Sequence, residues 1–423
     1  MEDNIKSEKK RSLFTGIAIG MAIMLVISVA VVSVYYVTGL IRSSLFSVGN
    51  GINLTPSSVS SDEYLVDDTV ADKAEFIYRQ ILDNFLFEEN IDPELMRENI
   101  YKSMLLSLDD PYAEYYTVDD MNELFMSSEG IYYGIGSYVS MDAETGYPQL
   151  TGVFPDSPAS RADLRDGDYI VKVDGEEVPG LNLTEVVNLI RGPEDTEVVL
   201  TIKRNNVADL FDVTVIRGKV TTPTVTYEMK ENSIGYIKIT EFDDVTSDQF
   251  KEAYGALNSE NMKGLIIDLR SNGGGNLDTV LEICEQILPA GIITYTEDKY
   301  GNRQDYESRG KTPIQIPLAV LTNGYTASAS ELMSGAIRDY NLGVLIGTNT
   351  FGKGIVQSIY PFSDGSGMKL TTSRYFTPSG VCIHGEGLAP DYEVEFDSDA
   401  YYAEESFDNQ LDFALNYIKD RIN

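Results

Sequence analysis

The chain has 423 residues, which suggests two to four domains, and its net charge is −35, from 32 basic and 67 acidic side chains. A surface this acidic repels a phosphate backbone, so nucleic acid is not an expected partner. The single histidine, His384, excludes a histidine-rich zinc site, and the two cysteines, Cys284 and Cys382, lack the CxxC spacing of a zinc site. We therefore expect no metal and no cofactor, and we favour two unpaired cysteines over a disulfide bridge.

The beginning of the chain predicts a membrane anchor. Residues 1–11 contain the basic stretch KSEKKR, and no charged side chain occurs in residues 12–41. About 20 apolar residues cross the hydrocarbon core of a bilayer, so residues 12–41 are predicted to form a transmembrane helix. Basic residues stay on the cytoplasmic side, which makes 1–11 a cytoplasmic tail and places the Ser- and Gly-rich linker 42–62 and everything after it outside. A cleaved secretory signal is the alternative, although its apolar region would be shorter.

Residues 63–128 are predicted to be a helical region. Apolar residues recur there at helical spacing, and the segment Asp92-Pro93-Glu94 supplies a helix cap followed by proline in the first turn. The stretch SLDDPYAEYYT then ends the helical pattern in a turn.

Residues 129–217 have a different pattern. The stretches VVLTIKR and FDVTVIR alternate or run β-branched, as strands do, whereas LTEVVNLIRG has helical spacing and stops at Gly192-Pro193. We predict a small β-rich module with one or two helices.

Short apolar strands alternate with amphipathic helical patterns in residues 218–395. The strands are GYIKI, GLIIDL, IPLAVLT and VLIGT. This alternation predicts an α/β layer with buried, largely parallel strands. Residues 396–423 contain one more amphipathic helix, NQLDFALNYIKDRI, whose apolar face is a candidate interaction surface.

Three hydroxyl residues lie in LTNGYTASASELMSGAI, where a predicted strand gives way to a helix. Thr326, Ser328 and Ser330 form the turn, beside the free N–H groups of a helix N-terminus, which favour developing negative charge. The residues from Ser328 to Glu331 also match the S-x-x-E capping box. Taken alone, helix capping is therefore the plainer explanation, and a nucleophilic serine is the alternative.

A serine needs a base before it can act as a nucleophile. Lys353 lies between glycines in TNTFGKGIVQS, and Gln357 follows four positions later. A lysine between glycines is ordinarily an exposed loop residue. Once removed from water, however, its pKa falls from about 10.4 toward neutrality and it can accept a proton. In a chain with one histidine, lysine is the base that we expect for an activated serine, with Gln357 orienting its ammonium group.

Three consecutive glycines, Gly273 to Gly275, follow a buried strand in DLRSNGGGNL. Their backbone N–H groups can approach a ligand closely, as in a phosphate cradle or an oxyanion hole. The GxxxxGK[ST] spacing of a phosphate loop is missing. A plain turn and an oxyanion donor are the two interpretations that remain.

Together these segments resemble the carboxyl-terminal processing proteases, also called tail-specific proteases, which are Ser/Lys peptidases with a PDZ domain. DLRSNGGGNL resembles the family's oxyanion segment, with Gly273 where proline is often found, and TASASELMSGAIRDY resembles the nucleophile segment. TFGKGIVQ is similar to the base segment and YFTPSGVCIHGEGLAPD to the C-terminal signature. The resemblance covers about Asp67 to Val394. It implies an α/β fold with a ClpP/crotonase-like protease core at 218–395 and a PDZ domain at 129–217.

The family's functional residues fall on matching positions of this chain. The resemblance implies that Ser328 is the nucleophile, Lys353 the base and Gln357 the residue that positions the lysine. It also implies an oxyanion hole formed by the backbone N–H groups of Gly274 and Ala329.

The PDZ resemblance rests on GVFPDSPASRADLRDGDYIVKVDGEEV, with LTEVVNLIRG as the main helix. PDZ domains take an extended peptide as an added strand and bind its terminal carboxylate with backbone N–H groups. The stretch YYGIGSYV matches that loop, which implies that Tyr133, Gly134, Ile135 and Gly136 bind peptide. An ordinary β-turn before a strand is the alternative.

We predict a membrane-anchored, extracytoplasmic serine endopeptidase that recognises and cleaves the C-terminal tails of proteins. By analogy with the family, its helical region, together with the C-terminal helix, is expected to form a homodimer contact. Two other classes stay open. One is a PDZ scaffold without catalytic activity, against which the intact Ser328, Lys353 and Gln357 argue, and the other is a crotonase-like thioester enzyme, against which the PDZ module argues. His384 is expected to be structural.

Overall fold

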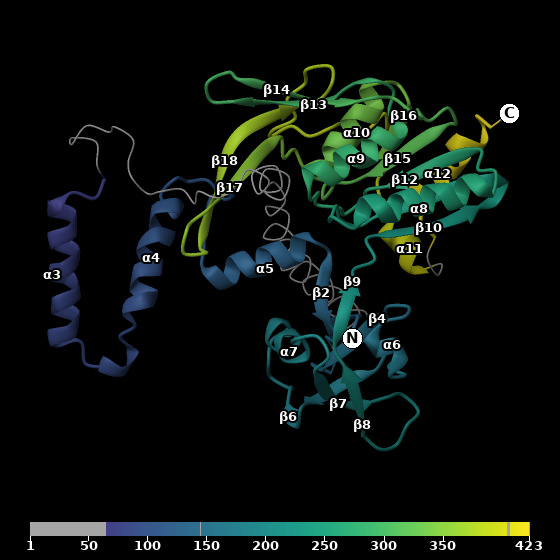
Figure 1. The fold of residues 1–423 in the computed structure, drawn as a ribbon. Coiled ribbons are helices and arrows are strands. Elements are labelled where there is room, and N and C mark those ends of the chain that lie inside the picture. The colour runs from purple at the N-terminus through teal and green to yellow at the C-terminus, as the bar shows by residue number, and fades with distance from the viewer. Residues whose placement is uncertain (1–64, 144, 404–406, 423) are drawn as a thin grey trace, which may run out of the picture. The chain divides into compact units, whose positions relative to one another are not determined.

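The computed structural model describes residues 65–143, 145–403 and 407–422 (Figure 1). Within them the chain divides into two units. The smaller unit runs to Asn122 and takes in Gln357–Thr372, and the larger contains Glu123–Val356 and the residues from Ser373 onward. The predicted cytoplasmic tail, transmembrane helix and linker lie outside the described residues. Among the residues that are described, no helix has the length and apolar character needed to cross a membrane.

The smaller unit begins with two helices that have no buried residue, α3 (Asp68–Asn84) and α4 (Pro93–Leu106). The predicted cap of α4 is confirmed, because the Asp92 side chain accepts hydrogen bonds from two backbone N–H groups of the first turn and Pro93 follows it. The predicted turn before residue 117 contains a short strand, which pairs antiparallel with Gly367–Lys369. The remaining elements of this region are η2 (Glu88–Asn90), β1 (Glu114–Tyr116), α5 (Val118–Ser128), β17 (Ile355–Pro361) and β18 (Gly367–Phe376).

A β-rich module follows in the larger unit. Five of its strands form an antiparallel sheet in the order β3-β4-β5-β7-β8, β6 pairs with β5, and β2 pairs with β9. Strand β3 therefore lies at an edge of the sheet, and α7 packs against β3 and β5. The elements are β2 (Ile131–Gly134), β3 (Ser137–Met141), β4 (Pro148–Val153), α6 (Pro158–Arg161), β5 (Tyr169–Val173), β6 (Glu176–Glu177), α7 (Leu183–Ile190), β7 (Glu197–Lys203), β8 (Phe211–Ile216) and β9 (Gly218–Thr221).

The core of the larger unit is a sheet in the order β10-β11-β12-β15-β16-β19, parallel from β11 to β19 and antiparallel between β10 and β11. Every residue of β12 and β15 is buried, as expected for central parallel strands covered on both faces. The mixed α/β prediction is thereby confirmed for this layer. Its elements are β10 (Val225–Lys230), η3 (Glu231–Ser233), β11 (Ile234–Ile239), α8 (Thr246–Ser259), β12 (Gly264–Asp268), α9 (Leu277–Ile287), β15 (Leu318–Thr322), α10 (Ala329–Asp339), β16 (Gly343–Gly347) and β19 (Tyr392–Glu393).

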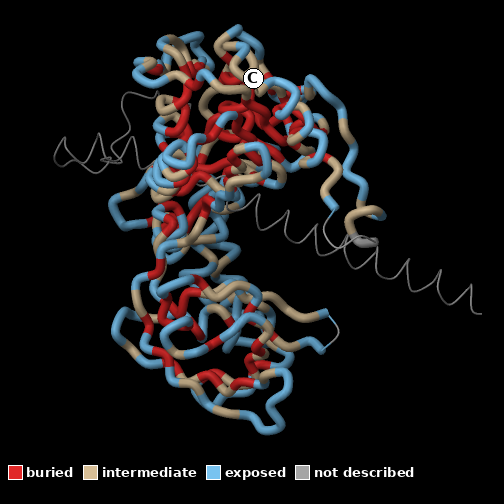
Figure 2. The backbone as a smooth tube through the Cα atoms, turned by 90° about the vertical axis from the view of Figure 1, so that its right-hand side faces the viewer, coloured by how far each residue is buried: buried red, intermediate tan, exposed pale blue. Residues whose placement is uncertain are grey.

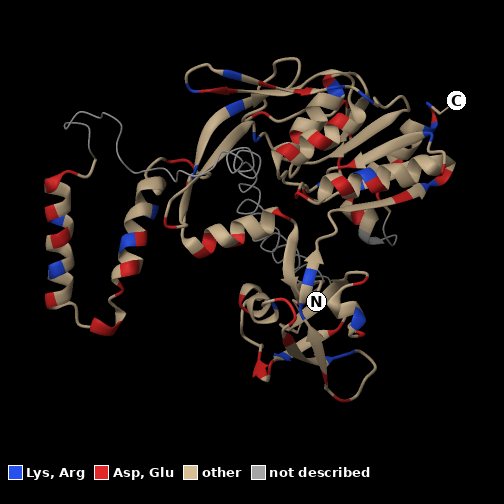
Figure 3. Cartoon of the chain, viewed as in Figure 1, with Lys and Arg blue, Asp and Glu red and all other residues tan. Residues whose placement is uncertain are grey.

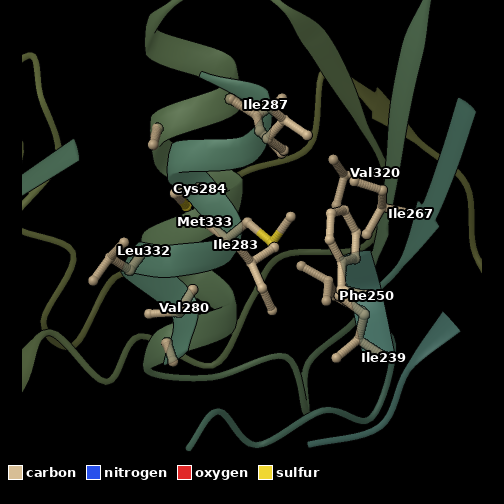
Figure 4. Packing of buried hydrophobic residues seen from close by; sticks show 14 of the residues in the cluster. Ile239, Phe250, Ile267, Val280, Ile283, Cys284, Ile287, Val320, Leu332 and Met333 are labelled. Atoms are coloured by element: carbon tan, nitrogen blue, oxygen red, sulfur yellow. The ribbon is translucent and has the colours of Figure 1, made fainter. Parts of the chain in front are cut away.

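Helices cover both faces of this sheet. On one face, Ile267 and Val320 pack with residues of α8, α9 and α10, and Figure 4 shows Phe250, Ile283 and Met333 pointing toward them. Figure 2 shows buried residues gathered in the interior and exposed residues on the outer loops of the chain. The structure thus places the turn before α10 at the end of a rigid central strand.

The other face is covered by the C-terminal helix α12 (Asn409–Lys419), which follows α11 (Ser398–Ala403). Ala414 and Ile418 of α12 are buried against Ile266 and neighbouring residues of the sheet. Ala414 and Ile418 therefore pack on the chain's own sheet, and a dimer contact through this helix stays a prediction. Its amphipathic pattern is explained by packing within the chain.

A second, smaller sheet region of the larger unit contains β13 (Gly291–Asp298), β14 (Arg303–Ser308) and the residues of β18 from Ser373 to Phe376.

Cys284, buried in α9, and Cys382, half-buried, are free thiols, which agrees with the prediction of two unpaired cysteines. Figure 3 shows acidic residues spread over helices and loops of the described chain.

Candidate active site

Ser328 lies at the N-terminus of α10, in the turn after β15, with φ 56° and ψ −118°. A non-glycine residue with positive φ costs about 1–3 kcal/mol and persists only where its surroundings hold it. The predicted position between strand and helix is therefore confirmed, and the backbone there is strained in the way that functional turns often are.

The side chain of Glu331 holds this turn. Its carboxylate accepts a hydrogen bond from the backbone N–H of Ser328 at 2.9 Å, as the capping box predicts. The carboxylate is also completely buried and accepts from the Thr350 hydroxyl at 2.6 Å, from Gly352 N–H at 2.7 Å and from Lys353 N–H at 2.9 Å. Glu331 thus joins the segment of the candidate nucleophile to the segment of the candidate base, a role that the sequence did not indicate.

Glu331 acts as an acceptor for all of these groups. Burial raises its pKa, and the hydrogen bonds from Thr350, Gly352, Ser328 and Lys353 oppose that shift. Backbone N–H groups can only donate, so each of the three needs a lone pair on the acid. With the Thr350 hydroxyl donating as well, four donors converge on the two oxygens, and an ionised carboxylate can accept from all of them.

Lys353 is buried, with 3% of its surface exposed, so the interpretation of an exposed loop lysine is wrong. Its neighbouring glycines allow a close approach to the C-terminal signature. A Cβ atom on Gly354 would lie 2.5 Å from the backbone N of His384, and one on Gly352, whose φ is +90°, would lie 2.9 Å from the N of Gly387. His384 itself has an exposed side chain and contributes backbone to this contact.

The two predicted oxyanion donors lie next to Ser328. A Cβ atom on Gly274 would be 2.8 Å from Ser328 Cβ and 2.9 Å from Ala329 N. The two N–H groups differ, because that of Gly274 donates to Asn272 Oδ1 at 2.8 Å, whereas that of Ala329 donates no hydrogen bond within the described residues. A substrate oxygen would therefore find the Ala329 N–H open and would compete with Asn272 for the other.

Gln357 lies on β17 and Tyr375 lies on β18. Gln357 is buried in β17, and its amide donates to Thr371 Oγ1 at 3.3 Å, within the smaller unit. Its predicted contact with Lys353 stays a prediction. Tyr375 was not singled out from the sequence, although it lies in the C-terminal signature, and its hydroxyl donates to the carbonyl oxygen of Ser328 at 3.0 Å. No local pattern would have indicated that contact.

The predicted peptide-binding loop is partly strand. Tyr133 and Gly134 end β2 and are paired with Lys219 and Gly218 of β9. Ile135 is 2% exposed in the core of the β-rich module, and Gly136, with φ +79°, leads into the edge strand β3. Ile135 therefore offers only its backbone to a ligand.

Comparisons with known proteins agree with this arrangement. The model of peptidase family S41 matches residues 233–394, and that of the PDZ domain matches residues 150–204. The chain is 35% identical over 310 residues to a carboxy-terminal-processing protease of Bartonella bacilliformis, covering 72% of this chain and 70% of that protein. It is 33% identical over 362 residues to the carboxy-terminal processing protease CtpA of Bacillus subtilis, covering 85% of this chain and 76% of that protein.

A solved structure assigned to the S41 proteases of Bacteroides fragilis shares the fold. It covers 85% of this chain and 98% of its own, with a TM-score of 0.52 and 19% sequence identity. The matched family models and the two relatives carry the assignment. The chain belongs to the carboxy-terminal processing proteases, which are serine proteases of peptidase family S41 with a PDZ domain.

Proposed function

We propose that the protein is a membrane-anchored endopeptidase outside the cytoplasm, which binds the C-terminal tails of proteins through its PDZ domain and cleaves them with Ser328 and Lys353. The observation that carries the proposal is the buried carboxylate of Glu331, which accepts hydrogen bonds from the backbone N–H groups of both residues. This link ties a strained serine to a buried lysine, and burial favours the uncharged amine that a general base needs.

The proposed reaction has two halves. Uncharged Lys353 accepts the proton of Ser328 Oγ as this oxygen bonds to the carbonyl carbon of the scissile peptide. The oxyanion is stabilised by the Ala329 N–H, and by the Gly274 N–H once Asn272 releases it. The carbon–nitrogen bond then breaks, and Lys353 gives its proton to the leaving amine. Water hydrolyses the acyl-enzyme by the same route, with Lys353 again as the base. The role of Gln357 in orienting the lysine is retained as part of the proposal.

The tail-binding part of the proposal rests on β3 and α7. An edge strand has unpaired backbone groups that an extended peptide can pair with, and the turn at Ile135 and Gly136 leads directly into this strand. A peptide ending in a free carboxylate should therefore bind, and the same peptide with an amidated C-terminus should bind at least tenfold more weakly.

The test is a comparison of wild type and Ser328→Ala. The wild-type protein should cleave an unstructured protein substrate, and the alanine variant should not, while both bind the C-terminal peptide with the same affinity. Equal cleavage by the two proteins would refute the role of Ser328. Mass spectrometry of membrane and secreted proteins with and without Ser328 would then identify the substrates by their altered C-termini.

The anchor and the homodimer are further parts of the proposal. The uncharged run of residues 12–41 supports the anchor, and fractionation should place the full chain with membranes and a chain lacking these residues in the soluble fraction. Exposed apolar side chains on and after α3 support the dimer, among them Phe76 at 63%, Ile77 at 50% and Leu86 at 82%. Light scattering should show a dimer that Phe76→Asp dissociates and that Tyr300→Asp, in an exposed turn of the other unit, leaves intact.

A further inference from the structure

Tyr375 contacts the segments of both Ser328 and Lys353. Its hydroxyl donates to the carbonyl oxygen of Ser328 at 3.0 Å, and its backbone N–H donates to the carbonyl oxygen of Gly354 at 3.1 Å. The residue lies on β18, is 4% exposed and packs in the main hydrophobic core. Its position is therefore held by the core, to which helix α10 also contributes, and by the backbone hydrogen bond to Gly354, which is not part of that helix.

We infer that Tyr375 is a positioning residue that orients the Ala329 N–H toward the oxyanion. The inference rests on the proposed function and deepens it. The carbonyl of Ser328 and the N–H of Ala329 belong to one peptide unit, which is planar. A hydrogen bond that anchors the oxygen of this unit consequently sets the direction in which its N–H points.

The hydrogen bond from Tyr375 comes from a different element than the other hydrogen bonds to the carbonyl oxygen of Ser328. The N–H groups of Glu331 and Leu332 also donate to it, at 2.9 and 3.0 Å, but both belong to helix α10 and move with it. Tyr375, on β18, connects this peptide unit to Gly354. The Ala329 N–H therefore keeps its position relative to the segment that contains Lys353. A donor on the carbonyl also polarises the amide and strengthens its N–H as a donor.

This peptide unit matters more here because the two candidate donors are unequal. The Gly274 N–H is engaged by Asn272, and the Ala329 N–H is the one without a hydrogen bond among the described residues. Stabilisation of a developing oxyanion therefore depends first on Ala329, and through its peptide plane on Tyr375.

The test compares Tyr375→Phe with Tyr340→Phe. Tyr340 is a matched control, because its hydroxyl also donates to a backbone carbonyl at 3.0 Å, that of Ile292, and its ring packs against the same core. Each variant loses one hydroxyl oxygen and keeps the ring. Loss of an oxyanion-hole donor lowers kcat by about 10²–10³. Because Tyr375→Phe loosens the donor without removing it, we expect kcat to fall about tenfold with KM changed less than twofold.

Four readouts separate positioning from a structural effect. Tyr340→Phe should have the kcat of wild type and a melting temperature lowered as much as that of Tyr375→Phe. The pH at which kcat is half-maximal should stay the same in both variants, since neither touches the base, and both should bind a C-terminal peptide like wild type. An unchanged kcat in Tyr375→Phe, an equal loss in Tyr340→Phe or a shifted pH profile would overturn the inference. Cleavage that Ser328→Ala does not diminish would instead overturn the proposed function, and the inference with it.

Discussion

The carboxylate of Glu331, in the first turn of α10, accepts a hydrogen bond from the backbone N–H of Lys353 at 2.9 Å. The same carboxylate accepts from the N–H of Ser328, so one side chain starts the helix and holds the neighbouring loop. A helix cap is normally a local device that can be replaced at modest cost. Here it has a second set of partners 19 to 22 positions further along the chain.

Replacing this carboxylate with an amide should harm both stability and activity. Glu331→Gln puts an NH₂ group against backbone N–H donors, and an unsatisfied buried polar group costs about 1–3 kcal/mol. We expect the free energy of unfolding to fall by that amount and the cleavage rate to fall at least tenfold. Urea unfolding and cleavage assays on the same preparation measure the two effects.

Glu185→Gln is the matched control for this variant. Glu185 forms the same capping box in α7, where it accepts from Asn182 N–H at 2.7 Å, but it is exposed and water can replace its contacts. Its replacement should change stability by less than about 1 kcal/mol. Equal losses in the two variants would show that Glu331 acts as an ordinary cap.

The identity of the base is tested by Lys353→Arg. A guanidinium group does not give up its proton in proteins, so this variant should be inactive at every pH at which it is folded. In the wild type, activity should rise with pH as the amine loses its proton. Lys311→Arg, at an exposed position, should match wild type. Activity in Lys353→Arg with a flat pH profile would exclude the lysine as the base.

The glycines beside Lys353 should resist substitution. Gly352→Ala and Gly354→Ala each place a methyl group less than 3.0 Å from backbone atoms of residues 384–387, which are not free to move as a side chain would be. Each should lower the free energy of unfolding by about 1–3 kcal/mol and reduce cleavage.

Substitution of Gly255 by alanine is expected to have the opposite effect on stability. It lies on the exposed face of α8, where a Cβ atom would meet nothing within 4 Å. Gly255→Ala should therefore stabilise the protein by about 0.5–1 kcal/mol and leave cleavage unchanged. Tolerance of alanine at 352 and 354, measured by thermal unfolding beside this control, would contradict the close backbone approach.

Glu241 should make stability depend on pH. Burial raises its pKa to about 7. The pKa of Glu241 in the folded state lies above the unfolded value of about 4.3, so the folded state binds this proton more tightly. The contribution of that proton to the free energy of unfolding is complete below pH 4 and is lost as the pH rises through 7. The free energy of unfolding should fall over this range by roughly 1–3 kcal/mol more in wild type than in Glu241→Gln, which stays neutral. Glu252→Gln, on the surface of α8, should keep the wild-type profile, and a Glu241→Gln profile parallel to wild type would refute the assignment.

The strands and helices of the core were predictable because their signals are local. The runs GLIIDL and IPLAVLT are continuously apolar, and both became fully buried strands. The strand β1 was missed, and its segment was predicted to be a turn. It is only three residues long, and its partner strand lies more than 250 positions away in the chain, where no local pattern reports it.

The candidate site was predictable to the level of segments. The turn at Ser328, the buried Lys353 and the closeness of Gly274 to Ser328 all agree with expectation. The link through Glu331 was not foreseen, because a capping box explains an S-x-x-E pattern completely without any distant partner. The engagement of the Gly274 N–H by Asn272 depends on side-chain orientation, which spacing along the chain does not specify.

The shared carboxylate also bears on transplanting this site into another scaffold. A designer who moved the strand, turn and helix around Ser328 would carry over the serine and Glu331 but leave three of the four donors behind. Such a graft would bury a carboxylate whose hydrogen bonds are unsatisfied. Residues 350–353 therefore have to be transferred together with the strand, turn and helix, and the two segments form a single module for protein engineering.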